Sequence, residues 1–204
     1  QATMQDFIAA EYSDIFNQAK INFQDRAELV QVVGGAIGRR MDQVVLDALT
    51  AASGTLTVAN SVGGSNTNLN VAKLRDIKKQ MDAKNVPSQG RVIIAHANNM
   101  DALLSETSVT SSDFNSVKAL VQGDIDTFMG FRFIRSERLG LDGNSNRQVL
   151  AFTNTSMGLA LGKDIQTKIS ERADKNYSTQ VYLCMTIGAT RVEDEKVLEI
   201  ACTE

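Results

Sequence analysis

The chain contains a single histidine, His96, and two cysteines, Cys184 and Cys202. A serine or cysteine nucleophile needs a positioned base, and His96 is the only histidine available for that role. It directly follows the apolar run at residues 91–95, the sequence has no GxSxG turn, and neither cysteine belongs to a CxxC pair. One histidine and two separated cysteines also do not make a four-ligand zinc set. These patterns predict a structural histidine, two buried reduced thiols, and neither a catalytic nor a zinc site.

Alternating oxygen-bearing side chains at Asp142, Asn144 and Asn146 resemble the start of a calcium-binding loop. Such a loop needs a glycine at its sixth position and a carboxylate at its twelfth, where this chain has Arg147 and Thr153. Aspartate, asparagine and glycine at this density are typical of a turn between strands. We therefore predict a solvated hairpin turn and no bound metal.

Asp124 and Asp126 form a DxD triplet, which in some sugar transferases holds a divalent ion and a nucleotide diphosphate. Here no glycine-rich loop that would cradle phosphate accompanies the triplet. The glycines of residues 34–38 (GGAIG) fall inside a helical pattern instead of following a strand, so they are not a nucleotide-binding fingerprint. The sequence therefore predicts no cofactor and no enzyme, with a metal-dependent nucleotide-sugar transferase as a distant alternative.

The composition is that of a globular protein and not of a nucleic-acid-binding one. Hydrophobic residues make up 43% of the 204 residues, charged residues make up 22%, and the formal net charge is −3. Proteins that grip nucleic acid are usually basic, because their affinity comes largely from neutralising phosphates, so weak and non-specific DNA binding is expected. No apolar stretch reaches the roughly 18 residues of a membrane helix, and no signal peptide opens the sequence. We therefore expect no membrane partner and folding in a reducing cytoplasm.

The elements that would carry these residues begin with a long amphipathic helix over residues 25–52. Asp25 offers an N-cap with Glu28 as its capping-box partner. An apolar stripe follows at steps of three and four, at Leu29, Val33, Ile37, Met41, Val44 and Ala48. Gly34 and Gly38 lie inside this helix, although glycine there costs about 1 kcal/mol relative to alanine. They either let another backbone approach closely or mark a bend that packing tolerates.

The remaining chain predicts shorter helices followed by strands. The polar segment 60–68 is expected to be a flexible loop, and an amphipathic helix ending before Pro87 has on one side Val71, Leu74, Ile77, Lys78 and Met81. A buried, fully apolar strand at 91–95 precedes a short helix that contains Met100, Leu103 and Leu104. Later strands are expected at 131–134, 149–152, 165–169, 181–187 and 197–202, with Asp174–Tyr177 as a hairpin tip. Helices early and strands late make the fold class α+β.

Four segments resemble the major capsid proteins of tailed double-stranded DNA phages, which share the Hong Kong 97 shell fold. They are AIGRRMDQVVLDAL (Ala36–Leu49), LNVAKLRDIKKQMDAKNVP (Leu69–Pro87), GDIDTFMGFRFIRSERL (Gly123–Leu139) and residues 169–204. They occur in the family's order and span most of the chain, and the second half is similar to the short-tailed phage group. The resemblance implies an α+β, Hong Kong 97-like capsid fold with a long spine helix, an axial domain and a peripheral domain.

The resemblance also implies a domain layout. Residues 1–24 would be the remnant of an extended arm and hairpin, and residues 25–54 would contain the spine helix of the peripheral domain. Residues 55–162 would form the axial domain. Residues 163–191 would return as strands of the peripheral domain, and residues 192–204 would add a last strand to the axial sheet.

A member of this family self-assembles into pentamers and hexamers that form an icosahedral phage head around double-stranded DNA. The implied partners are other copies of the chain, scaffolding and portal proteins, and a decoration protein, first in the host cytoplasm and then in the virion. One chain must then fit both five-fold and six-fold surroundings, and the segment 60–68 is a candidate adjustable joint. Predicted contact residues between subunits are Gly34, Gly38, Arg135, Glu137, Arg172, Asp174 and Lys175. The nearest alternative is an encapsulin-like compartment, which uses the same fold to hold cargo proteins.

Overall fold

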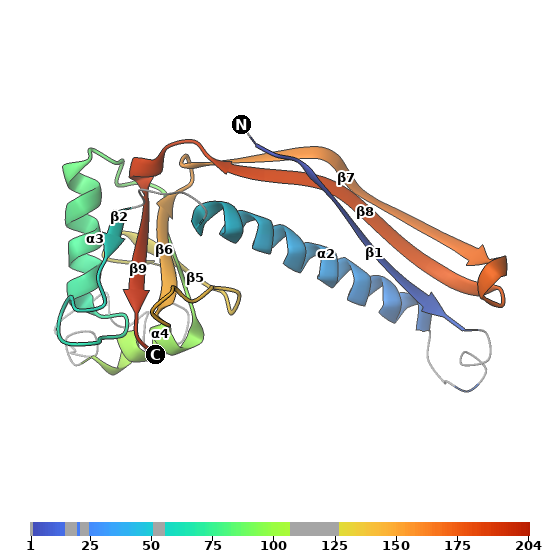
Figure 1. Cartoon of the computed structure of the whole chain (residues 1–204), viewed down its shortest axis with the longest axis horizontal. Helices are drawn as coiled ribbons and strands as arrows, with labels where there is room; N and C mark the ends of the chain where they lie inside the picture. The colour runs from blue at the N-terminus through green and yellow to red at the C-terminus, as the bar shows by residue number, and fades with distance from the viewer. Residues whose placement is uncertain (1, 15–19, 21–24, 51–55, 107–126) are drawn as a thin grey trace. The chain divides into compact units, whose positions relative to one another are not determined.

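The computed structural model describes residues 2–14, 20, 25–50, 56–106 and 127–204. Among these, helices come early and strands dominate the second half (Figure 1), which confirms the α+β class. Three predicted features lie outside the described residues: the DxD triplet of Asp124 and Asp126, the capping side chain of Asp25, and the helix end at residues 51 and 52.

The chain divides into two compact units. Unit 1 comprises residues 1–48 and 158–190, and unit 2 comprises residues 49–157 and 191–204. Each unit is therefore built from segments that are far apart in the sequence. None of the helices in the described part of the chain combines the length and the apolar composition that crossing a bilayer requires.

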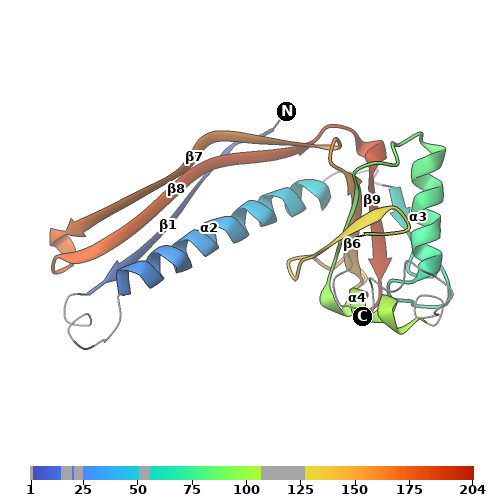
Figure 2. The same ribbon diagram turned by 180° about the vertical axis from the view of Figure 1, so that it is seen from behind.

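Unit 1 packs the helix α2 (Asp25–Thr50) on one face of a three-stranded sheet (Figures 1 and 2). The strand order is β1-β8-β7, with β1 at Gln5–Ser13, β8 at Ser178–Arg191 and β7 at Met157–Arg172. β1 runs antiparallel to β8, from Gln5 opposite Ile187 to Ser13 opposite Thr179. The central strand is thus β8, and both β1 and β7 are edge strands.

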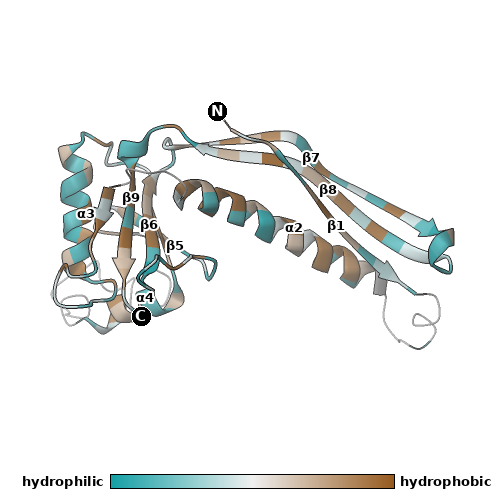
Figure 3. Ribbon diagram, in the orientation of Figure 1, coloured by the Kyte–Doolittle hydropathy of each residue, from teal (hydrophilic) through white to brown (hydrophobic). Residues whose placement is uncertain are grey.

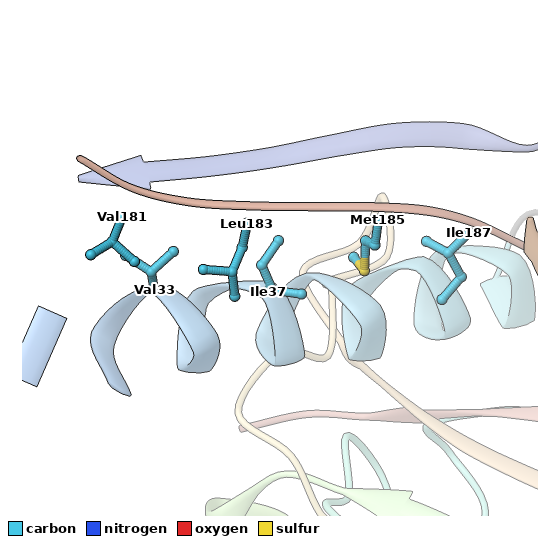
Figure 4. Close-up of a cluster of buried hydrophobic side chains, with 6 residues drawn as sticks. All are labelled: Val33, Ile37, Val181, Leu183, Met185 and Ile187. Atoms are coloured by element: carbon cyan, nitrogen blue, oxygen red, sulfur yellow. The ribbon is translucent and has the colours of Figure 1, made fainter. Parts of the chain in front are cut away.

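The core of unit 1 is one layer of side chains between α2 and the sheet (Figure 4). Its buried members are Val33 and Ile37 of α2 and Val181, Leu183, Met185 and Ile187 of β8. Partly buried side chains surround them, namely Phe7, Ala9, Leu29, Met41 and Val44. This packing confirms the helical stripe from Leu29 to Val44 and the strand predicted at 181–187, whose buried side chains alternate with the period of two that a strand has. Each fully buried aliphatic side chain contributes about 1.5–3 kcal/mol relative to leaving it exposed.

The turn between β7 and β8 is the predicted hairpin tip. A short 3-10 helix, η1 (Ala173–Lys175), is followed by Asn176 and Tyr177, whose φ angles are 51° and 57°. Two successive residues in the left-handed region reverse the chain within a few residues, and asparagine tolerates that region well. The structure therefore confirms the prediction that Asp174–Tyr177 connects two strands.

Unit 2 is built on a six-stranded mixed sheet of order β2-β9-β6-β3-β5-β4. The strands are β2 (Leu56–Val58), β3 (Arg91–Ala95), β4 (Thr127–Phe128), β5 (Phe131–Arg135), β6 (Arg147–Thr153) and β9 (Val197–Cys202). β2 pairs in parallel with β9 and β3 with β5, whereas the other neighbours are antiparallel. Consecutive residues of β3, β6 and β9 are buried, as expected where both faces of a sheet are covered.

Two helices and a 3-10 turn complete the described part of unit 2. They are α3 (Val71–Ala83), α4 (Ala97–Ser105) and η2 (Asp194–Lys196). α3 begins at Asn70, whose side-chain oxygen accepts a hydrogen bond from the backbone N–H of Lys73 at 2.7 Å. Such an N-cap satisfies one of the orphan N–H groups of the first turn and stabilises a helix by about 1 kcal/mol.

Three details of the sequence prediction are wrong. The stripe of α3 is confirmed at Leu74, Ile77 and Met81, but Lys78 is exposed, and the lysine that the helix buries is Lys73. The strand at 91–95 was predicted to be fully apolar, but its first residue, Arg91, is buried with the others. Arg91 Nη2 donates to Asp82 Oδ1 and to the Val86 carbonyl, both at 2.6 Å. Both thiols were predicted to be buried. Cys202 is buried, but Cys184 is only half-buried, because side chains alternate along β8 and that of Cys184 points away from α2.

Candidate functional sites

The hairpin tip of unit 1 presents three of the predicted contact residues at one exposed point. Arg172 donates from Nε to Asp174 Oδ1 at 2.9 Å and from Nη2 to Oδ2 at 3.0 Å. This two-bond pair lowers the pKa of the Asp174 carboxyl and raises the pKa of the Arg172 guanidinium, so both groups stay charged at neutral pH. Lys175 adds a third charge beside them, and Tyr177 is exposed at the same tip. The arrangement is a small, pre-organised polar surface beside an exposed aromatic side chain, suited to contact with another protein.

The glycines of α2 occupy open positions within the chain. A Cβ atom built on Gly34 or Gly38 would meet nothing within 4 Å, while one on Gly35 would lie 3.1 Å from the Arg39 guanidinium. No neighbouring segment among the described residues therefore requires Gly34 or Gly38 to lack a side chain. Close backbone approach at these positions stays a prediction about a second copy.

We expect Gly38→Leu to leave the isolated subunit folded and to impair its assembly. Replacing glycine in a helix removes about 1 kcal/mol of propensity cost, and the space around Gly38 holds no neighbour to clash with. Overpacking at a contact between copies would instead cost roughly 1–3 kcal/mol per contact. Thermal denaturation and sedimentation of assembled particles measure the two effects. Normal assembly with a higher melting temperature would mean that the glycines are merely tolerated.

At one end of the unit 2 sheet, four segments bring together ionisable side chains that are distant in the sequence. His96 lies at the N-cap of α4, with Nε2 2.6 Å from Glu137 Oε2 and Nδ1 3.0 Å from Glu204 Oε1. Glu137 also accepts from the backbone N–H of Ala97 at 3.1 Å, at the start of α4. The geometry gives His96 and Glu137 structural roles at this helix start. Arg135, the other predicted contact residue nearby, is exposed at the end of β5.

Arg147 completes this cluster. Its Nη2 donates to Glu204 Oε2 at 2.8 Å, its Nε donates to Oε1 at 3.2 Å, and its Nη1 donates to the Leu139 carbonyl at 2.8 Å. The hydrogen bond from Arg147 is the largest cause that lowers the pKa of the Glu204 carboxyl, and the same bond raises the pKa of Arg147. The cluster thus joins β6, the residues after β9 and the start of α4.

This ion pair predicts an acid-sensitive contribution to the stability of unit 2. Because the pKa of Glu204 is lower in the folded than in the unfolded chain, the contribution is present above the ordinary glutamate pKa of about 4.3 and is lost as the pH falls through the folded value. Glu204→Gln should therefore lower the melting temperature at pH 7. It should also reduce the difference in melting temperature between pH 7 and pH 3. Glu195→Gln, which alters an exposed carboxylate 3.4 Å from Lys84, is the matched control. A variant whose acid profile follows the wild type would contradict this role of Glu204.

The segment around Asp142 is a closed turn, as predicted. Asp142 Oδ1 accepts from the backbone N–H groups of Asn144 and Asn146, both at 2.8 Å, and Oδ2 accepts from the Asn146 side chain at 3.0 Å. These bonds lower the pKa of the Asp142 carboxyl and use its oxygens for the turn. The turn borders a cavity of about 330 Å³, whose lining includes Asn60 and Glu199. Within the described ranges, no group of three or more histidine, cysteine or acidic side chains has metal-binding geometry.

Residues 60–68, predicted to be a flexible loop and an adjustable joint, are held by a hydrogen-bond network that their composition did not indicate. Thr67 Oγ1 donates to the carbonyl of Asn60 at 2.8 Å and to that of Val62 at 2.9 Å. The buried ammonium of Lys73 donates to the Thr67 carbonyl at 2.6 Å and to the Ala201 carbonyl at 2.8 Å. Burial is the largest cause that lowers the pKa of Lys73. The loop is thus fastened to both α3 and β9 through one side chain.

Cys202 lies beside this lysine and is not poised for chemistry. Its Sγ is 4.0 Å from Lys73 Nζ, and burial raises the pKa of the thiol to about 11. A thiol with so high a pKa is almost wholly protonated at neutral pH, and the thiolate is the reactive form. Cys202 therefore acts as a small buried hydrophobe at the end of β9.

Solved structures of low sequence identity share this fold. A structure from Mycobacterium phage Che8 aligns with a TM-score of 0.79 at 18% identity, covering 96% of this chain and 70% of that chain. The capsid structure of the cyanophage P-SCSP1u aligns with a TM-score of 0.79 at 15% identity, covering 98% and 73%. An encapsulin complex from Synechococcus elongatus aligns less well, with a TM-score of 0.62 at 9% identity, covering 98% and 73%. This likeness confirms the Hong Kong 97-like capsid fold.

The sequence itself assigns the family. A comparison with curated proteins gives no match. The profile of the family described as phage capsid protein matches residues 1–204, all 204 residues of the chain. This chain therefore belongs to the phage capsid protein family, whose members are structural, shell-forming proteins of the virion.

Proposed function

We propose that this chain is the major capsid protein of a tailed phage and self-assembles into the hexamers and pentamers of an icosahedral head that encloses double-stranded DNA. The observation that carries the proposal is the family match over residues 1–204, together with a fold shared with phage capsids. The role is structural and not enzymatic. The transferase alternative has no support from the family match.

The two compact units suit the domain layout of such a shell protein. Unit 1, with its long helix α2 and its hairpin, would be the peripheral domain, and unit 2, with its six-stranded sheet, would be the axial domain. Assembly would proceed in the host cytoplasm with scaffolding and portal proteins, and a decoration protein would bind the finished shell. DNA would be enclosed without sequence-specific contacts, in keeping with the net charge of −3.

The predicted contact residues would act through rigid elements and not through a catalytic pocket. Gly34 and Gly38 lie on α2, and Arg172, Asp174 and Lys175 lie at the hairpin tip. One chain that occupies five-fold and six-fold positions needs contacts that accept two related geometries. Charged pairs at the rim of a contact would set its register more than its affinity, so charge reversal at Arg172 would disturb assembly while weak DNA binding would not change.

An encapsulin-like compartment is the second candidate, supported by the shared fold with the Synechococcus elongatus encapsulin at a TM-score of 0.62. The experiment that separates the two candidates is the content of particles purified from cells that make the whole set of head proteins. Nuclease-resistant double-stranded DNA inside the particles is the expected result. Particles that hold a cargo protein and no DNA would support the compartment instead.

A further inference from the structure

The edge strand β7 carries an apolar row that unit 1 leaves uncovered. Leu161, Ile165 and Ile169, here called the β7 row, are 53%, 43% and 56% exposed. The described core of unit 1 draws its side chains from α2, β8 and β1, and none from β7. A long, exposed apolar edge strand invites association unless something covers it.

The β7 row lies on the α2 side of the sheet. A Cβ atom built on Gly162 would lie 2.9 Å from Met4 Sδ and 3.2 Å from Thr186 Cγ2. Thr186 points away from α2, since its neighbours Met185 and Ile187 point into the core. Even-numbered residues of β7 therefore lie on the face away from α2, here called the far face. The odd-numbered β7 row lies on the opposite face, beyond the area that α2 covers.

The other edge strand, β1, together with Met4, the residue that precedes it, carries a second apolar row on the far face. Met4, Ile8 and Tyr12, here called the β1 row, are 45%, 64% and 43% exposed. Tyr12 accepts a hydrogen bond from Gln180 at 3.3 Å, and Asp6, between Met4 and Ile8, accepts one from Thr186 Oγ1 at 2.6 Å. Figure 3 shows apolar residues recurring along both strands. The two rows thus lie on opposite edges and opposite faces of one sheet.

The two rows match in spacing and in charge. Each has an apolar residue at every fourth position, a repeat of about 13 Å at roughly 3.3 Å per residue. The residue inside the first repeat is Asp6 in β1 and Lys163 in β7, and the residue inside the second is Ala10 in β1 and Thr167 in β7. When the rows are laid together in the same direction, three apolar pairs form and Asp6 meets Lys163.

Strand direction favours this alignment between copies that are displaced sideways. β1 is antiparallel to β8, and β8 returns from β7 through a hairpin, so β1 and β7 run in the same direction. A neighbouring copy shifted across the sheet, with a small rotation, keeps its β1 parallel to this β7. Contacts between two different patches of identical chains are heterologous, and they close into rings when the rotation permits.

We propose that the β1 row of one copy packs against the β7 row of the next, so that neighbouring unit 1 sheets overlap like tiles. The occupant of the exposed face of β7 is therefore a second copy of this chain, with Asp6 of one copy paired to Lys163 of its neighbour. This inference rests on the proposed function, because it names the surfaces through which the shell-forming copies meet.

The test exchanges the charges between the two rows. Asp6→Lys and Lys163→Asp, each alone, place like charges opposite one another and should lower the yield of sedimenting particles roughly tenfold or more. The double variant restores an opposite pair, reversed in sign, and should recover the wild-type yield to within about threefold. Asp164→Lys is the matched control, because Asp164 is the exposed neighbour of Lys163 on the far face. Thermal denaturation of each unassembled variant checks that the subunit still folds.

The outcomes separate this inference from the proposed function. Rescue by the double variant supports the contact, because that variant still lacks Asp6 and its hydrogen bond from Thr186 and so cannot regain assembly through them. Single variants that assemble like the wild type, or a double variant no better than the singles, would overturn the contact while leaving the proposed function intact. A wild-type chain that never assembles would overturn both.

Discussion

Val33→Asp should unfold unit 1, whereas the same substitution one residue earlier, Val32→Asp, should be tolerated. Val33 is 2% exposed and packs against β8, while Val32 is 56% exposed on the same helix. An unpaired carboxylate in this single-layer core costs about 3–5 kcal/mol or more, which is a large part of the stability of a small domain. At the exposed position the cost is only the lower helix propensity of aspartate, below about 1 kcal/mol.

Urea denaturation of the unassembled chain measures this difference. The expected result is a lost or strongly shifted unfolding transition for Val33→Asp and a nearly unchanged midpoint for Val32→Asp. The two positions are adjacent and the change is identical. An equal shift of the unfolding midpoint in both variants would therefore mean that α2 does not pack on the sheet through the face that contains Val33.

Lys73→Met should destabilise unit 2 by about 2–4 kcal/mol. The ammonium of Lys73 donates to the partly buried carbonyls of Thr67 and Ala201, and methionine has a similar length but no donor. The gain from no longer burying a charge offsets part of the loss, but the two carbonyls then lose a charged hydrogen-bond partner.

Lys78→Met is the matched control for this substitution. Lys78 lies on the exposed side of α3, so the same chemical change there should alter stability by no more than about 0.5 kcal/mol. Comparing the free energies of unfolding of the two variants isolates the buried interaction. An equal effect of the two substitutions would contradict the assignment of Lys73 as the lysine that fastens the loop to β9.

Periodicity predicted the elements of this fold well, because each element buries one face. The three- and four-residue steps from Leu29 to Val44 and the alternation of β8 arise from contacts between a helix and a sheet that repeat regularly along both. The hairpin tip was also readable, since Asp174–Tyr177 combines turn-forming residues between two apolar strands.

Periodicity did not predict which polar side chains are buried. Lys73 and Lys78 both lie on α3 near its apolar stripe, and what places Lys73 inside is a pair of carbonyls, one of them 128 residues away. The contact of His96 with Glu204 likewise depends on the sheet, in which β6 pairs with both β3 and β9 and so brings their ends to the same edge. Only the folded topology brings such partners together, so local pattern carries no signal for them. Residues that contact another copy of the chain are harder still to predict, because one chain does not contain the surface that they meet.

Cryo-electron microscopy of particles purified from cells that express the protein tests the central claim most directly. The expected result is closed icosahedral shells in which density for this fold repeats around five-fold and six-fold positions, with α2 and the three-stranded sheet recognisable in each copy. A protein that stays monomeric at every concentration, or that forms only disordered aggregates while its subunits remain folded, would contradict the assignment as a shell-forming capsid protein.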